Sequence, residues 1–299
     1  MMRKYLTIIA LVLVGFLTIS LLGAYLITKQ DHLAFGDSVA VITVHGTISM
    51  SADSGVLQEG KATPQKFKED INQANRDGSV KAILIEINSP GGSVVASDEI
   101  ARAIKESEKP VVAWLGEIAT SGGYYIASAA DYIVADKASI TGSIGVISIF
   151  PEYSKLLEKI GLNFTVVKGG AFKDFSTGYR PMTEGEREML EGLVQEIYVQ
   201  FLDEVAINRN LSMDYVRSVA DGKIYTGTKA MDLKLVDDVG GRDYAIKKAA
   251  ELGEIEGAPN VVTYGKKAFL GEFLSKASAN FGYGFGKALV EGREPLTLG

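Results

Sequence analysis

Short apolar runs rich in β-branched residues alternate along this chain with longer segments that have helical spacing. The clearest runs are residues 39–44 (VAVITV), 82–87 (AILIEI) and 111–115 (VVAWL). Runs of this length and composition predict buried strands. Strands that alternate with helices form βα units, and such units build a mostly parallel or mixed sheet. The pattern therefore predicts an α/β fold class for most of the chain.

The longest predicted helix covers residues 183–208. Thr183 and Glu186 have the spacing of a capping box, in which each residue satisfies a free backbone N–H group of the other. The apolar stripe of this helix consists of Met189, Leu190, Leu193, Ile197, Phe201 and Val205. Shorter helices are predicted within residues 59–80 and at 94–108, 121–130, 152–160, 214–220, 228–233 and 242–252, and further strands at 132–135 and 164–167.

Residues 5–28 carry no charge. A helix of this length spans about 36 Å at 1.5 Å per residue, enough to cross a hydrocarbon core of roughly 30 Å. Arg3 and Lys4 precede the run, whereas Lys29 and Asp31 follow it and nearly cancel. The positive-inside rule then predicts a single-pass anchor in the cell membrane, with a cytoplasmic N-terminus and an extracytoplasmic domain. A cleaved signal peptide is the alternative, although its apolar core is usually only about 7–15 residues long.

These features divide the chain into five parts. The predicted parts are a cytoplasmic N-terminus at residues 1–4, a transmembrane anchor at 5–28, a linker at 29–37, the folded domain at 38–252 and a C-terminal tail at 253–299. From residue 266 the tail is rich in Gly, Phe and Lys, which fits either an interfacial amphipathic segment or a tail ordered only by a neighbouring subunit. No second apolar run comparable to the anchor follows residue 252, so one membrane crossing is expected.

The residue types that the chain lacks narrow its chemistry. It has no cysteine, which excludes thiol catalysis, iron–sulfur clusters and Cys-ligated zinc. Its two histidines, His32 and His45, are too few for a His-rich metal site. The formal net charge of −6 argues against a nucleic-acid scaffold, which would present a basic face. We therefore expect neither a metal nor another cofactor.

Three glycine-rich segments lie after predicted strands: residues 89–93 (SPGGS), 120–125 (TSGGYY) and 169–174 (GGAFKD). In the second segment Ser121 precedes a helix, where a serine is most often an N-cap. The two glycines that follow it instead let another backbone come close, and a helix start offers N–H donors to a developing oxyanion. Ser121 is therefore a candidate nucleophile, and residues 89–93 are a candidate source of a second N–H donor.

A serine hydroxyl needs a base to remove its proton. His32 lies beside the anchor and His45 ends the first strand, so neither is well placed. The other common base is a lysine, which must be neutral, and burial can lower a lysine pKa from about 10.4 toward 7. Lys168 and Lys173, beside and within the third glycine-rich segment, are the best candidates, and their spacing alone does not separate them.

In five motifs the chain resembles the signal peptide peptidase A family, the membrane-anchored serine proteases of peptidase family S49. The motifs are INSPGG (87–92), TSGGYY (120–125), ITGSIGVI (140–147), GGAFKD (169–174) and IYTGTKAMDLKLVDDVG (224–240). The resemblance covers roughly residues 36–252. It implies a Clp-protease/crotonase-like fold of stacked ββα units, here preceded by the transmembrane helix.

The resemblance also implies a Ser-Lys dyad and a role for individual residues. Ser121 matches the nucleophile, Lys173 matches the general base, and Ser143 matches a hydroxyl that orients the lysine. Gly92, joined by the backbone N–H of Gly122, matches the oxyanion hole. No metal or cofactor takes part in this chemistry.

Two lysines fall outside the family pattern. Lys168 does not match the general base. Lys234 stands where the family usually has the glycine of Gly-Leu-Val-Asp. Because a glycine at that position would serve a helix C-cap, we expect Lys234 to affect local conformation and not chemistry.

The implied activity is that of a serine endopeptidase that degrades remnant signal peptides after their release from preproteins. The implied partners are hydrophobic signal-peptide remnants, membrane lipid and further copies of the chain, with no nucleic acid. Two alternatives stay open from the sequence: a related membrane Ser-Lys protease that cleaves stomatin-like membrane proteins, and a non-proteolytic membrane scaffold.

Overall fold

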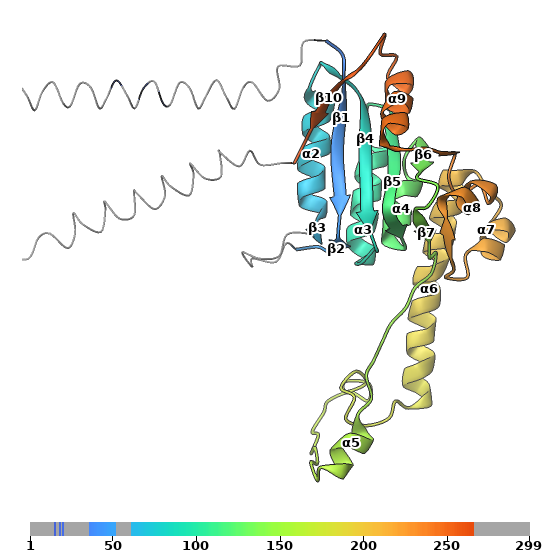
Figure 1. Cartoon of the computed structure of the whole chain (residues 1–299). Helices are drawn as coiled ribbons and strands as arrows, with labels where there is room; N and C mark the ends of the chain where they lie inside the picture. The colour runs from blue at the N-terminus through green and yellow to red at the C-terminus, as the bar shows by residue number, and fades with distance from the viewer. Residues whose placement is uncertain (1–14, 16–17, 19, 21–35, 52–60, 266–299) are drawn as a thin grey trace, which may run out of the picture.

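The computed structural model describes residues 36–51 and 61–265, together with the isolated positions 15, 18 and 20 (Figure 1). The predicted anchor at residues 5–28, apart from these three positions, and the predicted tail beyond residue 265 lie outside the described residues. Within the described part of the chain, no helix combines the length and the apolar character that a membrane crossing requires.

The domain is built on a mixed sheet of eight strands. The strands are β1 (Ser38–His45), β4 (Val80–Ser89), β5 (Val111–Thr120), β6 (Tyr132–Ala135), β7 (Ile140–Gly142), β8 (Ile224–Thr226), β9 (Asp238–Val239) and β10 (Asn260–Thr263). The main path runs β10-β1-β4-β5-β6-β9 with parallel neighbours, while β7 pairs in parallel with β5 and antiparallel with β8. The predicted α/β fold with a mixed sheet is confirmed. A separate pair, β2 (Thr47–Ile48) and β3 (Lys61–Ala62), lies beside it.

Helices cover both faces of the sheet (Figure 1). One face packs against α2 (Pro64–Arg76), α3 (Val94–Lys105) and α4 (Gly122–Ser128), and the other against α9 (Arg242–Leu252). Side chains alternate along a β-strand, so Ala40 and Ile42 enter the larger core while Val39 and Val41 pack in the core that α9 covers. Because both faces of the central strands are buried, their sequences are nearly continuous apolar runs.

The chain leaves the sheet at residues 146–183, here called the extension, and returns along a long helix (Figure 1). The helices in this part of the fold are α5 (Ser154–Lys159), α6 (Glu184–Arg209), α7 (Met213–Val219) and α8 (Gly227–Asp232). The strand predicted at residues 164–167 is wrong. These residues lie exposed in the extension, where no described strand runs beside them, and a strand forms only with a partner for its backbone hydrogen bonds.

Helix α6 begins with the predicted capping box. The Glu186 N–H donates to Thr183 Oγ1 at 3.4 Å, and the Thr183 N–H donates to Glu186 Oε2 at 2.8 Å. The C-terminal half of the helix packs on the domain through Phe201 and Val205, which are buried. The N-terminal half runs along the extension, and Leu193 there is 50% exposed. The predicted apolar stripe is therefore only half covered in a single chain.

The sheet continues past residue 252, where the sequence pattern places the end of the domain. Strand β10 pairs in parallel with β1 from Ser38–Asn260 to Val41–Thr263. Three of its four residues are exposed, because β10 lies at the edge of the sheet. With four residues, of which only Val261 and Val262 are apolar, the strand is too short for an apolar run to mark it.

Candidate active site

Ser121 forms the turn between β5 and α4, with φ of 51° and ψ of −121°. A positive φ is uncommon for a residue with a side chain. The surrounding backbone holds it in place, since the Ser121 N–H donates to the Gly142 carbonyl at 2.9 Å and the Tyr125 N–H donates to the Ser121 carbonyl at 2.9 Å. Ser121 occupies the N-cap position of α4, but its hydroxyl makes no capping bond to the helix, so the side chain is not used as a cap. A held, strained turn of this kind is typical of functional sites.

The SPGGS segment lies directly against this turn. A Cβ atom on Gly92 would lie 2.1 Å from the Ile48 carbonyl oxygen, so no side chain fits there. A Cβ atom on Gly122 would lie 3.4 Å from the Gly92 nitrogen, which places the two glycines side by side. The bridge between Ile48 and Gly92 uses the backbone groups of the residues on either side of Gly92 and does not consume the Gly92 N–H. The Gly122 N–H belongs to the first turn of α4, where helices have no internal partner for it.

Ser121, Gly92 and Gly122 line one cleft of about 480 Å³. Its apolar walls are Val94, Val95, Tyr125, Val146, Ile147, Ile197 and Phe201. The Tyr125 and Phe201 rings meet edge to face at 5.1 Å, so α4 and α6 close this part of the cleft together. Polar residues line the cleft as well, namely Ser97, Asp98, Gln200, Asp203 and Glu204. The cleft therefore offers a serine hydroxyl, two backbone N–H groups and a wall that is partly apolar and partly acidic.

Ser143 lies next to the Ser121 turn. It follows Gly142, whose carbonyl accepts the Ser121 N–H, and its own N–H donates to the Lys223 carbonyl at 2.7 Å. Ser143 also has a positive φ of 51° and is half-buried. The structure thus brings together four of the five predicted site residues: Ser121, Gly92, Gly122 and Ser143.

Lys173 lies elsewhere in the single chain. Its side chain is exposed in the extension and does not line the Ser121 cleft. The extension is attached near Glu186 at the start of α6, whereas the Ser121 helix packs near Phe201. At 1.5 Å per residue these two points are about 22 Å apart along the helix axis. A lysine side chain is much shorter than that, so the amine of Lys173 does not reach the Ser121 hydroxyl of its own chain in this conformation.

The two other candidate bases have different surroundings. Lys168 Nζ donates to Asp174 Oδ1 at 2.5 Å and to the Ala171 carbonyl at 2.8 Å, and it does not line the Ser121 cleft. His45 is exposed at the end of β1 and does not line the Ser121 cleft. His32 lies outside the described residues. Neither Lys168 nor His45 is placed to take the proton of Ser121.

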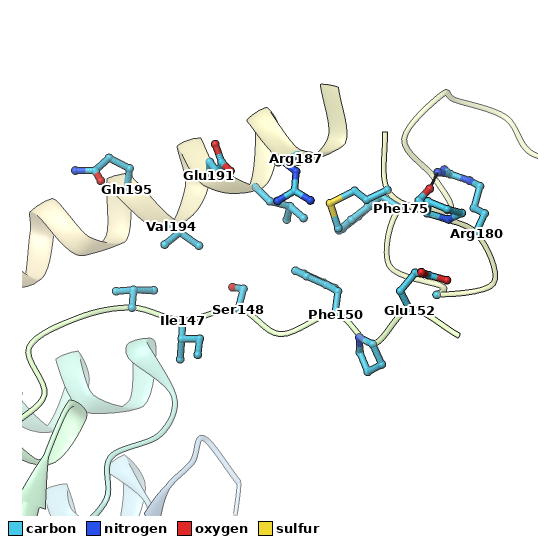
Figure 2. Close-up of a pocket in the computed structure, with 16 residues that line it drawn as sticks. Ile147, Ser148, Phe150, Glu152, Phe175, Arg180, Arg187, Glu191, Val194 and Gln195 are labelled. Carbon is cyan, nitrogen blue, oxygen red and sulfur yellow. Dashed lines mark hydrogen bonds between the residues drawn. The ribbon is translucent and has the colours of Figure 1, made fainter. Parts of the chain in front are cut away.

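Figure 2 shows a larger cleft of about 870 Å³ along the extension. Ile147 and Phe150 lie on one side of it, and Arg187 and Val194 of α6 lie on the other. Ser121 is not among its lining residues. It shares Val146 and Ile147 with the Ser121 cleft, so it continues that cleft along α6 without supplying a nucleophile.

An ion-pair network holds the base of the extension, and the sequence patterns did not predict it. Arg180 bonds the carboxylates of Asp174 and Glu186, which are 8% and 2% exposed. The hydrogen bonds from Arg180 hold the pKa of Asp174 well below its ordinary value, with further help from Lys168 and Tyr179. Arg180, followed by the Thr183 N–H, likewise lowers the pKa of Glu186 to about 2. One arginine between two acidic residues, all within thirteen residues, was the available signal, but charged residues at such spacing are common on exposed surfaces.

Within the described ranges, no group of three or more His, Asp or Glu side chains is arranged to hold a metal ion. A serine lies on a strand–helix turn with backbone N–H donors beside it, in an α/β fold with a mixed sheet. This combination defines a serine peptidase of the Clp-protease type. The Clp protease family model matches residues 61–139. The model of peptidase family S49 matches residues 103–256, and the chain belongs to this family.

Similar proteins agree with this assignment. A protein of Methanocaldococcus jannaschii that carries a protease name is 37% identical over 293 residues, 95% of this chain and 93% of its own length. A protein of Enterococcus faecium named as a signal peptide peptidase is 35% identical over 223 residues, 73% of this chain and 65% of its own length. These relatives place the chain in the signal peptide peptidase A family, as the five motifs predict.

Solved structures share the fold. An alanine variant of a membrane-bound stomatin-specific protease matches with a TM-score of 0.53 at 15% identity, over 78% of this chain and 99% of that one. A likeness at this level of identity establishes the Clp-protease-like architecture and nothing about the substrate.

Proposed function

We propose that this serine peptidase works with a Ser-Lys dyad and degrades remnant signal peptides at a membrane surface. The observation that carries the proposal is the Ser121 turn, where a hydroxyl that makes no capping bond shares one cleft with Gly92 and Gly122. A hydroxyl that its own helix does not engage is free to attack a carbonyl, provided that a base removes its proton.

The reaction proceeds in two stages. Neutral Lys173 takes the proton of Ser121 while the serine oxygen attacks the carbonyl carbon of the peptide. The N–H groups of Gly92 and Gly122 stabilise the negative charge on the carbonyl oxygen. Lys173 then gives the proton to the leaving amine, and the peptide C–N bond breaks. In the second stage Lys173 activates a water molecule, which hydrolyses the acyl ester and restores both residues.

We propose that Lys173 reaches the serine of a neighbouring copy in a homo-oligomer. The separation along α6 argues against a dyad within one chain, and the extension offers a surface suited to another chain. Its exposed apolar residues include Ile147, Ile149, Ile160 and Val167, with exposures of 79%, 77%, 65% and 96%. Apolar surface of this extent is unfavourable in water and is typical of protein interfaces. Contact with another copy would also remove Lys173 from water, which favours its neutral form.

The proposed substrates follow from the apolar residues that line part of the cleft and from the predicted anchor. Signal-peptide remnants are apolar and lie in the membrane, and an anchor at residues 5–28 would hold the extracytoplasmic domain where they emerge. The relative from Enterococcus faecium is named for this activity. Ser143 is proposed to orient the Lys173 amine, since it lies beside the Ser121 turn.

The test uses the full chain in detergent or vesicles and a synthetic apolar signal peptide as substrate. Ser121→Ala and Lys173→Ala should each reduce hydrolysis on the order of 10³-fold or more, because members of a catalytic unit fail together. Lys159→Ala, which removes an exposed lysine of α5 in the same extension, is the matched control and should retain hydrolysis. Thermal melting checks that all three variants fold. Hydrolysis at the wild-type rate by either of the first two variants would refute the dyad.

A further inference from the structure

The loop that carries Lys173 is fixed to the rest of the protein at one buried side chain. All residues from 161 to 173 are exposed, whereas the side chain of the next residue, Asp174, is 8% exposed. Exposed loop residues have few contacts to fix their position. The place of Lys173 is therefore set mainly by what holds its neighbour Asp174.

Arg180 is the central partner of Asp174. Its Nε and Nη2 donate to the two Asp174 carboxylate oxygens at 3.0 and 2.7 Å. Its Nη1 and Nη2 donate to the two Glu186 carboxylate oxygens at 2.9 and 2.6 Å, and Nη1 also donates to the Pro181 carbonyl at 3.0 Å. These five hydrogen bonds match the five N–H donors of a guanidinium. A lysine, with a single ammonium, cannot bridge two carboxylates in this way.

Through Glu186, Arg180 is bonded to the N-terminal end of α6. The carboxylate of Glu186 also closes the capping box by accepting the Thr183 N–H. The bonds therefore run without a break from the loop to the first turn of a 26-residue helix. Lys168 and Tyr179 add bonds to Asp174 at 2.5 and 2.8 Å, but both belong to the extension and do not connect it to α6.

We infer that Arg180 is a positioning residue for the general base: by clamping Asp174 to the capped end of α6, it sets where the Lys173 amine lies. This inference rests on the proposed role of Lys173. Arg180 itself does not touch the reacting atoms, since its donors are all committed to the clamp. Replacement of Arg180 would leave Asp174 attached only to its own loop, and Lys173 would sample many positions.

Arg180→Gln tests the inference, with Arg217→Gln as the matched control. Arg217 lies in α7, its side chain is exposed, and it lines neither of the two clefts. In the full chain with an apolar signal peptide, Arg180→Gln should reduce kcat/KM roughly 10- to 100-fold, the usual effect of small misplacements of a catalytic group. Arg217→Gln should leave kcat/KM within about twofold, since surface substitutions have small effects.

The pH profile separates positioning from a loss of folded protein. If fewer molecules are folded, kcat/KM falls by the same factor at every pH, and the midpoint of the pH profile is unchanged. A base that spends more time in water should shift the midpoint of the rising limb to higher pH. We expect this shift in Arg180→Gln and a smaller shift in Arg180→Lys, which keeps one charge and serves as the second variant if Arg180→Gln is poorly folded.

A double-mutant cycle completes the test. If Asp174→Asn and Arg180→Gln act through the same contact, the double variant should lose little more kcat/KM than the more damaging single variant. An unmoved midpoint in Arg180→Gln and Arg180→Lys, with Lys173→Ala inactive, would overturn the positioning role alone. A fully active Lys173→Ala would instead overturn the proposed base, and the positioning role with it.

Discussion

The Ser121 N–H donates to the Gly142 carbonyl at 2.9 Å, and this bond joins the strand–helix turn of the nucleophile to the end of β7. Strand β7 is parallel to β5 on one side and antiparallel to β8 on the other. Because Ser121 follows β5 and Gly142 ends β7, the sheet fixes both the donor and the acceptor of this hydrogen bond. As a result Ser143, the next residue, lies beside the turn although it is 22 residues from Ser121 in the chain.

Gly92→Ala should disrupt the site more than its small volume suggests. The new Cβ would lie 2.1 Å from the Ile48 carbonyl oxygen, so the segment carrying the Gly92 N–H has to move. Forced overpacking typically costs about 1–3 kcal/mol of stability. Hydrolysis should fall as well, because a displaced donor no longer stabilises the oxyanion. Urea unfolding and peptide hydrolysis measure the two effects.

The control for this substitution is Gly78→Ala, where a Cβ atom has nothing within 4 Å. It should leave both stability and hydrolysis nearly unchanged. Wild-type stability and activity in Gly92→Ala would show that the SPGGS segment has more freedom than the structure indicates.

Mixing two inactive variants tests whether the dyad forms between copies. Ser121→Ala supplies an intact Lys173, and Lys173→Ala supplies an intact Ser121. When the two are unfolded and refolded together in equal amounts, about one quarter of sites in a ring-like assembly should combine an intact serine with a neighbour's intact lysine. Hydrolysis should therefore recover to about one quarter of the wild-type rate.

Each variant refolded alone is the control and should stay inactive. If the mixture stays inactive as well, while both variants assemble normally in light scattering, the dyad lies within one chain. The extension then has to fold back so that Lys173 reaches Ser121 of the same chain.

Lys234→Gly should stabilise the protein. Lys234 has a φ of 56°, and it ends α8 in a Schellman motif: the Leu235 N–H donates to the Ala230 carbonyl and the Lys234 N–H to the Met231 carbonyl, both at 2.9 Å. A left-handed residue with a side chain is strained by roughly 1–2 kcal/mol, and glycine removes most of that cost. The net gain should be a few tenths to about 1 kcal/mol, since glycine also loses more entropy on folding.

Lys247→Gly is the opposite control. Lys247 is exposed inside α9, where glycine should destabilise by about 1 kcal/mol. Urea unfolding measures both variants. A loss of stability in Lys234→Gly would mean that the lysine side chain makes a contribution larger than its backbone strain.

Glu186→Gln should reveal the pH dependence of the network. The folded pKa of Glu186 is lowered to about 2 from an ordinary value of 4.5, mainly by Arg180. A lowered folded pKa adds stability that is fully present above the unfolded pKa and is lost as the pH falls through the folded pKa. The stability advantage of the wild type over Glu186→Gln should therefore be constant near neutral pH and shrink between about pH 4.5 and 2.

Thermal melts of both proteins across this range measure the difference. Because other carboxyl groups titrate in both proteins, only the difference between the two curves is informative. A difference that stays constant down to pH 2 would contradict the lowered pKa.

Local patterns were sufficient wherever neighbouring residues decide the structure. Helix α9 occupies residues 242–252 and strand β6 residues 132–135, both as predicted. The capping box of Thr183 and Glu186 also forms as predicted, since both partners lie within one helical turn. The five motifs were sufficient to place the chain in its family, because each keeps functional residue types at a fixed spacing.

Contacts between distant segments were decided only by the tertiary structure. The apolar residues 164–167 favour a strand by composition, but in the extension no strand runs beside them. Ser121 and Gly92 line one cleft, and Ser143 lies beside the Ser121 turn, because parallel strands bring their ends together. Lys173 is held away by the length of α6. The clamp of Arg180 depends on a loop closing on a helix end. Sequence spacing does not encode such distances, because they depend on how the elements pack.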